Sequence, residues 1–325
     1  MTSILVCGVI NWDTTLFVDK LPIPGEEVRV NRISSVPGGK GANTAVAAAR
    51  ILGASEVGII GMLGVDEIAN KQIKILENEG IDVSLIMKHE RLESGHAYVV
   101  VDSNGEDMIL THMAANQMMT PQIIVNEGIR SGIKQASMII IIDPPLEVAS
   151  KLAEQAKQMG KIVVLSPALL SKYGLIALRN YFNNADYIIL NEQEASFLAS
   201  AKDGISACKK ISEILDGKKN IITTLGNKGC VLCHNGKIAT IPTIDMASFG
   251  LKIQSTAGAG DTFIGTFGAF KTKGFNDAES LFLANIAAAL KTTKEETRGS
   301  PSYTEIKRYA DDERMRLLFN NIEPI

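Results

Sequence analysis

Short apolar runs alternate along the chain with segments of helical periodicity. Four of these runs lack the alternation of a half-exposed strand and predict strands buried on both faces: 138–142, 162–165, 187–190 and 221–224. Between the first two runs, Val148, Leu152 and Ala156 recur on one face of an expected helix. We therefore expect an α/β architecture with a mainly parallel central sheet covered by helices.

The same reasoning predicts further elements on either side of these runs. Strands are expected at 4–9 and 57–61. An alanine-rich helix over 43–52 ends at Gly53, and a second helix begins after the cap Asp66 and stops at Gly80. Helices are also expected at 260–273, 277–291 and 304–318.

Two regions, 26–36 and 95–113, resemble exposed strands without intervening helices. The second contains the turn sequence Ser103-Asn104-Gly105-Glu106. Strands outside the alternation of strand and helix predict a small separate sheet. Because no linker or repeat interrupts the chain, we expect a single domain over 1–325 that carries this sheet.

Composition excludes several classes of protein. The 325 residues are 46% hydrophobic and 21% charged, with a net charge of −3 and no basic block, which argues against a nucleic-acid partner. The N-terminus lacks the basic region of a secretory signal, and the longest apolar run, Met138–Ile142, is too short to cross a bilayer. With only four cysteines, we expect a cytoplasmic protein without a membrane partner.

Cys230-Val231-Leu232-Cys233-His234 matches a haem-attachment pattern. However, it lies in an apolar run followed by the hairpin sequence Asn235-Gly236. Residues three apart in a strand face opposite sides, so we predict ordinary strand residues here.

The most informative segment is Gly258-Ala259-Gly260-Asp261, directly before an apolar helix. Small residues at a helix start leave backbone N–H groups free to bind an anion such as a phosphoryl group. Asp261 could then accept a hydroxyl proton, as a general base in phosphoryl transfer does. The alternative is a helix cap that follows a tight turn. The chain contains no P-loop sequence.

A second glycine-rich segment, Gly38-Gly39-Lys40-Gly41-Ala42-Asn43, also opens a helix. Lys40 and Asn43 could bind substrate hydroxyls, or the segment could be a turn with a solvated lysine. Three candidate sites, Asp143, Asn191 and Leu225-Gly226, each come directly after an apolar strand. Ligands of open α/β sheets bind at these carboxyl ends, so we expect a site there.

Together these segments resemble the two sequence signatures of the ribokinase (PfkB-type) carbohydrate kinase family. The resemblance extends over essentially the whole chain through Gly8-Val9-Ile10-Asn11-Trp12-Asp13, Leu21-Pro22-Ile23-Pro24-Gly25-Glu26, Asn191-Glu192-Gln193-Glu194 and Thr224-Leu225-Gly226-Asn227-Lys228-Gly229. It implies a ribokinase-like three-layer fold, with a β-sheet lid formed by strands at about 12–38 and 95–113.

The resemblance also implies roles for individual residues. Asp261 is expected to be the base, with the amides of Gly258, Ala259 and Gly260 forming an anion hole. The expected substrate-binding residues are Asn11, Asp13, Gly39, Lys40, Asn43 and Asp143. The expected nucleotide-binding residues are Asn191, Thr224, Gly226, Gly229 and Asn285, and Glu194 is expected to contact Mg²⁺ through water. From the residues alone, the alternatives are that Asn191 and Glu194 cap a helix, that Asn11 and Asp13 form a turn, and that Asn285 is a surface residue.

The implied reaction is ATP-dependent phosphorylation of ribose to ribose 5-phosphate, with ATP and Mg²⁺ as cofactors and a homodimer formed through the lid. Lys40 and Asp143 favour ribose, and a nucleoside kinase or a fructokinase-like enzyme is the alternative. Ribokinases usually carry an aspartate at the position of Ser255 that helps to hold an activating monovalent cation, so we expect little activation by potassium. A non-catalytic binding protein would lack Asp261, and a Rossmann dehydrogenase would carry G-x-G-x-x-G after the first strand.

Overall fold

A nine-stranded central sheet organises the molecule, and its strands follow the order β13-β12-β11-β10-β9-β8-β1-β4-β5. The computed structural model describes residues 2–104 and 106–322. All strands from β11 to β5 in that order run parallel, and the β11–β12–β13 edge is antiparallel. Their bounds are β1 Ile4–Gly8, β4 Val57–Gly64, β5 Ile86–His89, β8 Met138–Ile142, β9 Ile162–Ser166, β10 Tyr187–Asn191, β11 Asn220–Thr224, β12 Cys230–His234 and β13 Lys237–Ile241.

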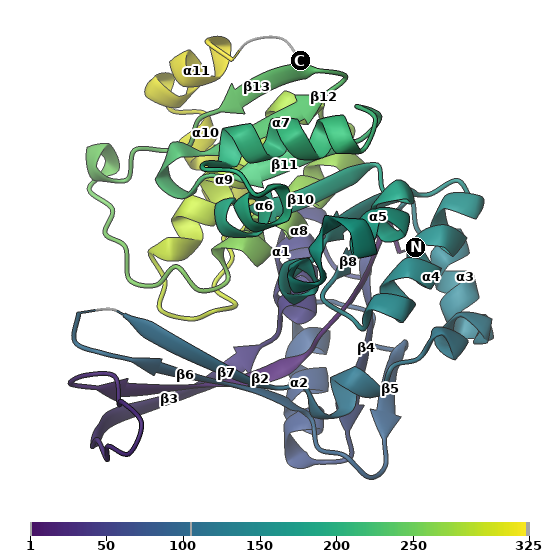
Figure 1. Cartoon of the computed structure of the whole chain (residues 1–325), viewed down its shortest axis with the longest axis vertical. Coiled ribbons are helices and arrows are strands. Elements are labelled where there is room, and N and C mark those ends of the chain that lie inside the picture. The colour runs from purple at the N-terminus through teal and green to yellow at the C-terminus, as the bar shows by residue number, and fades with distance from the viewer. Residues whose placement is uncertain (1, 105, 323–325) are drawn as a thin grey trace.

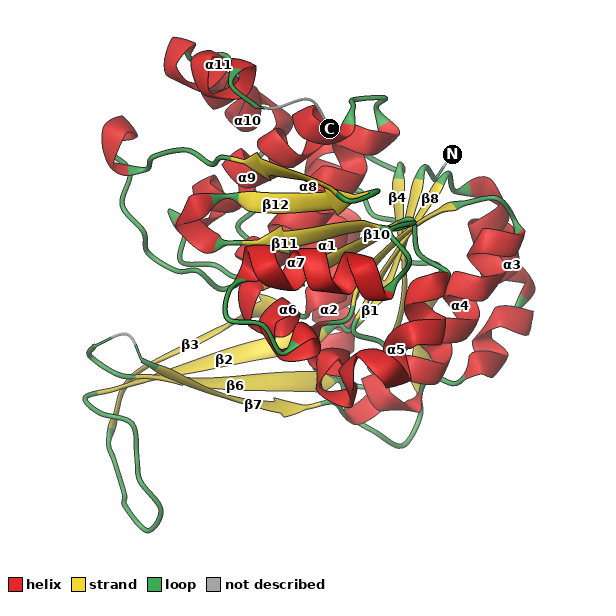
Figure 2. Ribbon diagram, turned by 45° about the horizontal axis from the view of Figure 1, so that its top comes forward, coloured by secondary structure: helices red, strands yellow, loops and turns green. Residues whose placement is uncertain are grey.

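Helices cover both faces of this sheet (Figure 2). The first layer contains α1 (Lys40–Leu52), α2 (Glu67–Asn78), α8 (Ala259–Thr272), α9 (Asp277–Thr292), α10 (Tyr303–Ala310) and α11 (Glu313–Asn320). The second contains α3 (Glu127–Gln135), α4 (Leu146–Gln158), α5 (Gly174–Asn183), α6 (Glu192–Ala199) and α7 (Gly204–Ile214). Successive side chains of one strand enter the two layers in turn: Ile4 packs into the first and Leu5 into the second. This arrangement confirms the prediction from the continuous apolar runs.

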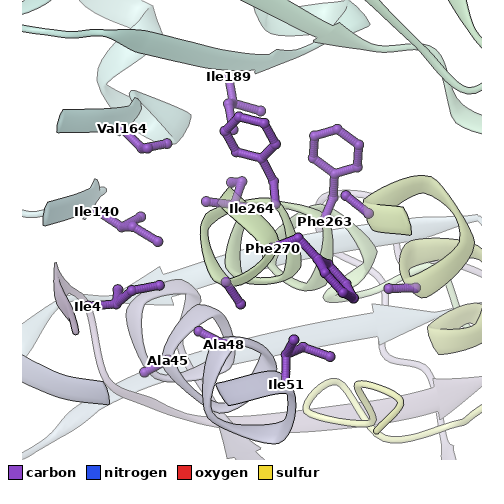
Figure 3. Close-up of a cluster of buried hydrophobic side chains, with 14 of the residues drawn as sticks. Ile4, Ala45, Ala48, Ile51, Ile140, Val164, Ile189, Phe263, Ile264 and Phe270 are labelled. Atoms are coloured by element: carbon purple, nitrogen blue, oxygen red, sulfur yellow. The ribbon is translucent and has the colours of Figure 1, made fainter. Parts of the chain in front are cut away.

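The first helix layer brings the two glycine-rich segments together. Figure 3 shows Ala45 and Ala48 on α1 beside α8, in the same buried cluster as Phe263 and Ile264 of α8. The small side chains of α1 allow the two helices to pack closely. Their N-termini therefore lie at the same edge of the sheet.

A second sheet projects from the carboxyl edge of the central sheet (Figure 1). Its strands follow the order β3-β2-β6-β7, with bounds β2 Asn11–Val18, β3 Val30–Gly38, β6 Gly95–Val101 and β7 Asp107–His112. Every residue of β7 is exposed, including Met108, Ile109 and Leu110. We call this four-stranded sheet the lid. Of the predicted turn 103–106, residue 105 lies outside the described residues.

Most predicted elements are confirmed, and one is wrong. The expected helix 304–318 is two helices, because α10 ends at Ala310 and Asp312 caps α11 by accepting a hydrogen bond from the Arg314 backbone N–H. Asn235 and Gly236 both have positive φ (48° and 75°) in the predicted hairpin between β12 and β13. Cys230 and Cys233 lie in opposite layers of the core, as expected for a strand. Among the described residues, no helix combines the length and apolarity needed to cross a bilayer.

Candidate active site

Asp261 lies in the first turn of α8 and is only 9% exposed. The Nδ2 of Asn43, in the first turn of α1, donates a hydrogen bond to Asp261 Oδ2 at 2.9 Å. The structure thus joins two segments that are 218 residues apart in sequence. Gly258 caps α8 with φ of 78°, and a Cβ there would lie 2.1 Å from the carbonyl oxygen of Thr297. Only glycine fits this close approach, so the start of α8 is held against the segment after α9.

Burial raises the pKa of Asp261 above its ordinary value. Lys40 and the hydrogen bond from Asn43 act in the opposite direction, whereas the nearby carboxylate of Asp143 raises the pKa further. A carboxylate with a raised pKa is a stronger base than a solvated one. This environment suits proton abstraction from an alcohol.

Lys40 and Asp143 form an ion pair at the mouth of the site, with Nζ and Oδ2 3.3 Å apart. Asp143 follows β8 directly and has a positive φ of 60°, and its Oδ1 accepts a hydrogen bond from the Leu169 backbone N–H. Burial raises the pKa of Asp143 even though Lys40 opposes the shift. Burial alone would lower the pKa of Lys40, but Asp143 and Asp261 outweigh it and the pKa is raised. Each member of the pair thus favours the charged form of the other.

Asn11 and Asp13 lie at the base of the lid, on β2. A Cβ on Gly38, the last residue of β3, would fall about 2.0 Å from Asp13 Oδ2, so the carboxylate packs directly on the glycine turn. Burial raises the pKa of Asp13 to about 6, although Arg298 and Lys40 act to lower it and Asp261 raises it. Because Asp261 raises the pKa of Asp13, the two carboxylates lie close enough to interact electrostatically. These residues belong to a strand, not to a simple turn.

Three buried polar residues that the sequence did not single out hold this arrangement together. Arg298 donates to Asn43 Oδ1 (3.1 Å), to Gln72 Oε1 (3.0 Å) and to the carbonyl of Gly38 (2.6 Å). Asn116 donates to Asn11 Oδ1 at 2.9 Å and also exchanges hydrogen bonds with the backbone of Ile10. Arg298 lies in the segment 292–302, which is rich in charged residues, and this composition is the sequence signal that could have drawn attention to it. No local pattern indicates the other two, because their partners are far away in sequence.

The expected nucleotide side lies at the carboxyl ends of β10 and β11. Asn191 and Glu194 form a capping box at the start of α6, so the capping interpretation holds for their hydrogen bonds. Burial raises the pKa of Glu194, and Lys40, Asp143 and Asp261 all influence it, which places Glu194 beside the same charge cluster. Thr224 ends β11 and is half-buried, whereas Gly226 and Gly229 have positive φ of 61° and 87°.

Asn285 is buried in α9 and is not a surface residue. Its Nδ2 donates to the carbonyls of Ile241 and Pro242, each at 3.0 Å. Its side chain therefore fixes the end of β13 to α9.

Across residues 2–104 and 106–322, no group of three or more His, Cys, Asp or Glu side chains could hold a metal ion. A Mg²⁺ ion in a kinase site does not need such a group. Substrate phosphates and water supply most of its ligands, and one or two protein carboxylates assist. Glu194, the residue expected to contact Mg²⁺ through water, is partly buried beside Lys40, Asp143 and Asp261.

Solved structures similar to this one include ribokinases and a nucleoside kinase. The structure superposes on the ribokinase of Thermotoga maritima with a TM-score of 0.83 at 26% identity, covering 96% of this chain and all of that one. It also superposes on the nucleoside kinase of Methanocaldococcus jannaschii with a TM-score of 0.78 at 18% identity, covering 96% of this chain and 98% of that one, a likeness that shows the fold alone. The central sheet, the two helix layers and the separate small sheet are thus a ribokinase-like fold.

Sequence comparison gives the family. The pattern of the pfkB family carbohydrate kinases matches residues 1–303, so the chain belongs to that family and is a carbohydrate kinase. The chain is 31% identical to the ribokinase of Haemophilus influenzae, over 92% of its own length and 94% of the relative's. It is 29% identical to the deoxyribokinase of Salmonella typhi, over 94% of its own length and 98% of the relative's. It also matches a bifunctional ribokinase/ribose-5-phosphate isomerase A of Fructilactobacillus sanfranciscensis at 32% identity over 82% of this chain, and there it spans 48% of that relative's length.

Proposed function

We propose that this kinase transfers the γ-phosphoryl group of ATP to the 5-hydroxyl of ribose, with Asp261 as the base. The observation that carries the proposal is the buried Asp261 at the start of α8, bonded to Asn43 and surrounded by Asp13, Lys40 and Asp143. This combines a proton acceptor, a helix N-terminus and polar groups for a polyol in one place. Membership of a carbohydrate kinase family and similarity to ribokinases support it.

In the proposed reaction, Asp261 accepts the proton of the sugar hydroxyl while its oxygen attacks the γ-phosphorus and ADP leaves. The amides of Gly258, Ala259 and Gly260 stabilise the transferring phosphoryl group. They lie at the N-terminus of α8, where backbone N–H groups and the helix dipole favour an anion. The Ala259 N–H also donates to the carbonyl of Thr256 at 3.2 Å, so it would be shared with a bound phosphoryl group. Such preorganised donors need no rearrangement as charge moves.

On the acceptor side, each proposed contact comes from a residue that is already held in position. Asn116 orients Asn11, and Arg298 orients Asn43. Lys40 and Asp143 would offer a donor and an acceptor and are held to each other by their ion pair. The proposed sugar-binding residues are Asn11, Asp13, Gly39, Lys40, Asn43 and Asp143.

On the donor side, the proposed nucleotide contacts are Asn191, Thr224, Gly226, Gly229 and Asn285. Glu194 would hold Mg²⁺ through water, and the ion would neutralise charge on the ATP phosphates. The backbone of η4 (Gly226–Lys228) follows β11 at the sheet edge, where open α/β sheets bind ligands. Because the side-chain amide of Asn285 is engaged with backbone carbonyls, its contribution would be to shape the adenine side of the cleft.

A nucleoside or a fructose-like sugar is the alternative acceptor, and the deoxyribokinase relative adds 2-deoxyribose to the set worth testing. The direct test is a substrate panel with purified protein and ATP. We expect kcat/KM for ribose to exceed the values for fructose, 2-deoxyribose and adenosine by at least about tenfold, or 1.4 kcal/mol in transition-state binding. A nucleoside preferred by the same margin would overturn the choice of ribose while leaving the kinase mechanism intact.

Asp261→Asn tests the mechanism itself. The amide keeps the size of the side chain but cannot accept the proton, so kcat should fall by about 10²–10⁴ while ribose affinity in calorimetry changes little. The matched control is Asp277→Asn, a half-buried aspartate in the first turn of the next helix, which pairs with Lys271. Wild-type turnover in Asp261→Asn would exclude a base role for Asp261.

A further inference from the structure

Lys291 lies near the C-terminus of α9, and its side chain is completely buried. Its Nζ donates to the backbone carbonyl of Ser255 at 3.2 Å and to that of Lys294 at 3.3 Å. A buried ammonium normally has a carboxylate partner. Here both recorded acceptors are backbone carbonyls, the kind of ligand that otherwise surrounds a bound monovalent cation.

The two carbonyls belong to two loops that meet at the start of α8: the loop that leads into α8 and the loop that follows α9. Ser255 precedes the anion-hole glycines, and Lys294 precedes Thr297, whose carbonyl packs against Gly258. The backbone N–H of Ser255 also donates to the carbonyl of Thr292 at 3.1 Å, so the loops run side by side. The Lys291 ammonium lies between the two loops, and the negative charge of Asp261 acts to raise its pKa.

We infer that Lys291 is an internal cation for phosphoryl transfer: its ammonium joins the two loops and supplies positive potential beneath the anion hole, so that no monovalent metal ion is needed. Lys291 is thus a positioning residue, and the inference rests on the phosphoryl transfer proposed above. It also accounts for serine at position 255, because a carboxylate there is not needed to hold a metal ion when a tethered ammonium occupies the space. The Oγ of Ser255 instead accepts a hydrogen bond from the Ala257 backbone N–H at 3.3 Å.

Charges around Lys291 predict a pH dependence. Burial lowers the pKa of Lys291 to about 8, Asp261 and Glu296 act to raise it, and Lys294 acts to lower it further. As pH rises through that value, the ammonium loses its proton and its charge. We therefore expect kcat to decline on the alkaline side of pH 8, and we expect this decline to be absent in Lys291→Met.

The central experiment compares Lys291→Met and Lys291→Ala with wild type. We expect kcat of both variants to fall at least tenfold, with KM for the sugar changed by less than about threefold, since the residue acts on the transition state. Potassium, ammonium or methylammonium should restore part of kcat in Lys291→Ala, where space is vacated, and none in Lys291→Met, where the side chain fills it. Replacing potassium by tetramethylammonium should leave the wild-type rate unchanged.

Lys271→Met and Lys271→Ala are the matched controls. Lys271 also joins α8 to the α9 region through a backbone carbonyl, that of Phe275 at 3.1 Å, and through an ion pair with Asp277. It lies at the opposite end of α8 from Asp261. These controls should lose stability but keep kcat, and no cation should change their rate.

A second measurement does not depend on turnover. Potassium or ammonium should raise the Tm of Lys291→Ala by binding in the vacated space and should leave the Tm of wild type and Lys271→Ala unchanged. If wild type phosphorylates no acceptor, the proposed function fails, and this shift still tests the cation replacement. The inference is overturned if Lys291→Met turns over at the wild-type rate, if potassium accelerates wild type several-fold, or if no cation shifts the Tm of Lys291→Ala.

Discussion

Individual carboxylates in the site have different protonation behaviour because their surroundings differ. Asp261 and Asp143 each have a cationic or amide partner, whereas Asp13 packs on a glycine turn and its pKa rises to about 6. Burial raises the pKa of all three carboxyl groups, and that of Asp13 rises to about 6, which a pH titration can reach. Its ionisation therefore offers a direct test of the proposed sugar site.

We predict that ribose binds roughly tenfold more weakly at pH 5 than at pH 7.5. The fraction of Asp13 present as carboxylate falls about tenfold for each pH unit below its folded pKa, and only the carboxylate accepts two hydroxyl hydrogen bonds. Isothermal titration calorimetry with ribose at both pH values measures this. Asp13→Asn should bind weakly at both, and an affinity of wild type that does not change with pH would contradict the role of Asp13.

The same pKa has a consequence for stability. Because folding raises the pKa of Asp13 above 3.8, the folded state binds more protons between pH 4 and 6, and the contribution of Asp13 to stability declines as pH rises through that window. The carboxylate is thus retained at a cost in stability, a property typical of functional sites.

At the scale of elements, the start of α8 is fixed by contacts from outside the helix. Gly258 packs against Thr297, whereas Gly260 has no heavy atom within 4 Å of a hypothetical Cβ. The two glycines therefore serve different purposes. One allows close packing, and the other leaves open space where the phosphoryl group is proposed to lie.

We predict opposite stability effects for alanine at these two positions. Gly258→Ala should lower stability by about 1–3 kcal/mol because it combines a positive φ with a backbone clash. Gly260→Ala should keep or slightly raise the Tm, since alanine is the better helix former by up to about 1 kcal/mol, but should reduce kcat by obstructing the phosphoryl group. Thermal unfolding and steady-state kinetics check both. Unchanged kcat in Gly260→Ala would argue against an anion at this amide.

Arg298 connects α1, α2 and the end of β3 through one guanidinium group. We predict that Arg298→Lys raises KM for the sugar and lowers stability by about 1–3 kcal/mol, because an ammonium cannot reproduce the planar fork and leaves buried acceptors unpaired. Urea unfolding and kinetics measure the two effects. The control Arg316→Lys, at an exposed and loosely paired position, should change neither.

The elements also show which features a sequence can reveal. Buried strands such as Met138–Ile142 were predictable because a continuous apolar run allows few alternatives. The break between α10 and α11 was missed because no Gly or Pro marks it, although Asp312 caps the second helix. Asp261 and Asn43 were predictable from local glycine patterns, whereas Gln72 and Asn116 act through partners more than 60 residues away.

At the scale of the whole molecule, the lid exposes apolar side chains on β3, β6 and β7. The exposed large hydrophobic residues there are Val30, Ile33, Tyr98, Met108, Ile109 and Leu110. β7 is also an edge strand with unpaired backbone groups. An exposed apolar edge of this kind favours self-association, which supports the proposed homodimer through the lid.

We predict that wild type sediments as a dimer and that Ile109→Lys sediments as a monomer with a higher KM for the sugar. The lysine would place an uncompensated charge in the apolar contact, and the lid would lose the support of its partner. Analytical ultracentrifugation and kinetics measure this. Ile176→Lys, at an isolated exposed position on α5, is the control and should remain dimeric. A monomeric wild type would exclude the proposed assembly.

The two hydrogen bonds of Asn43 limit how substrate specificity can change during evolution of such an enzyme. Its Nδ2 serves the proposed base and its Oδ1 is held by Arg298, so a single amide belongs both to acceptor binding and to the reaction chemistry. A substitution of Asn43 is therefore expected to change kcat even when it also alters substrate specificity. Variation that retargets the enzyme to a new acceptor is therefore expected to accumulate on the lid strands beyond Asn11 and Asp13, where side chains can be exchanged without disturbing Asp261.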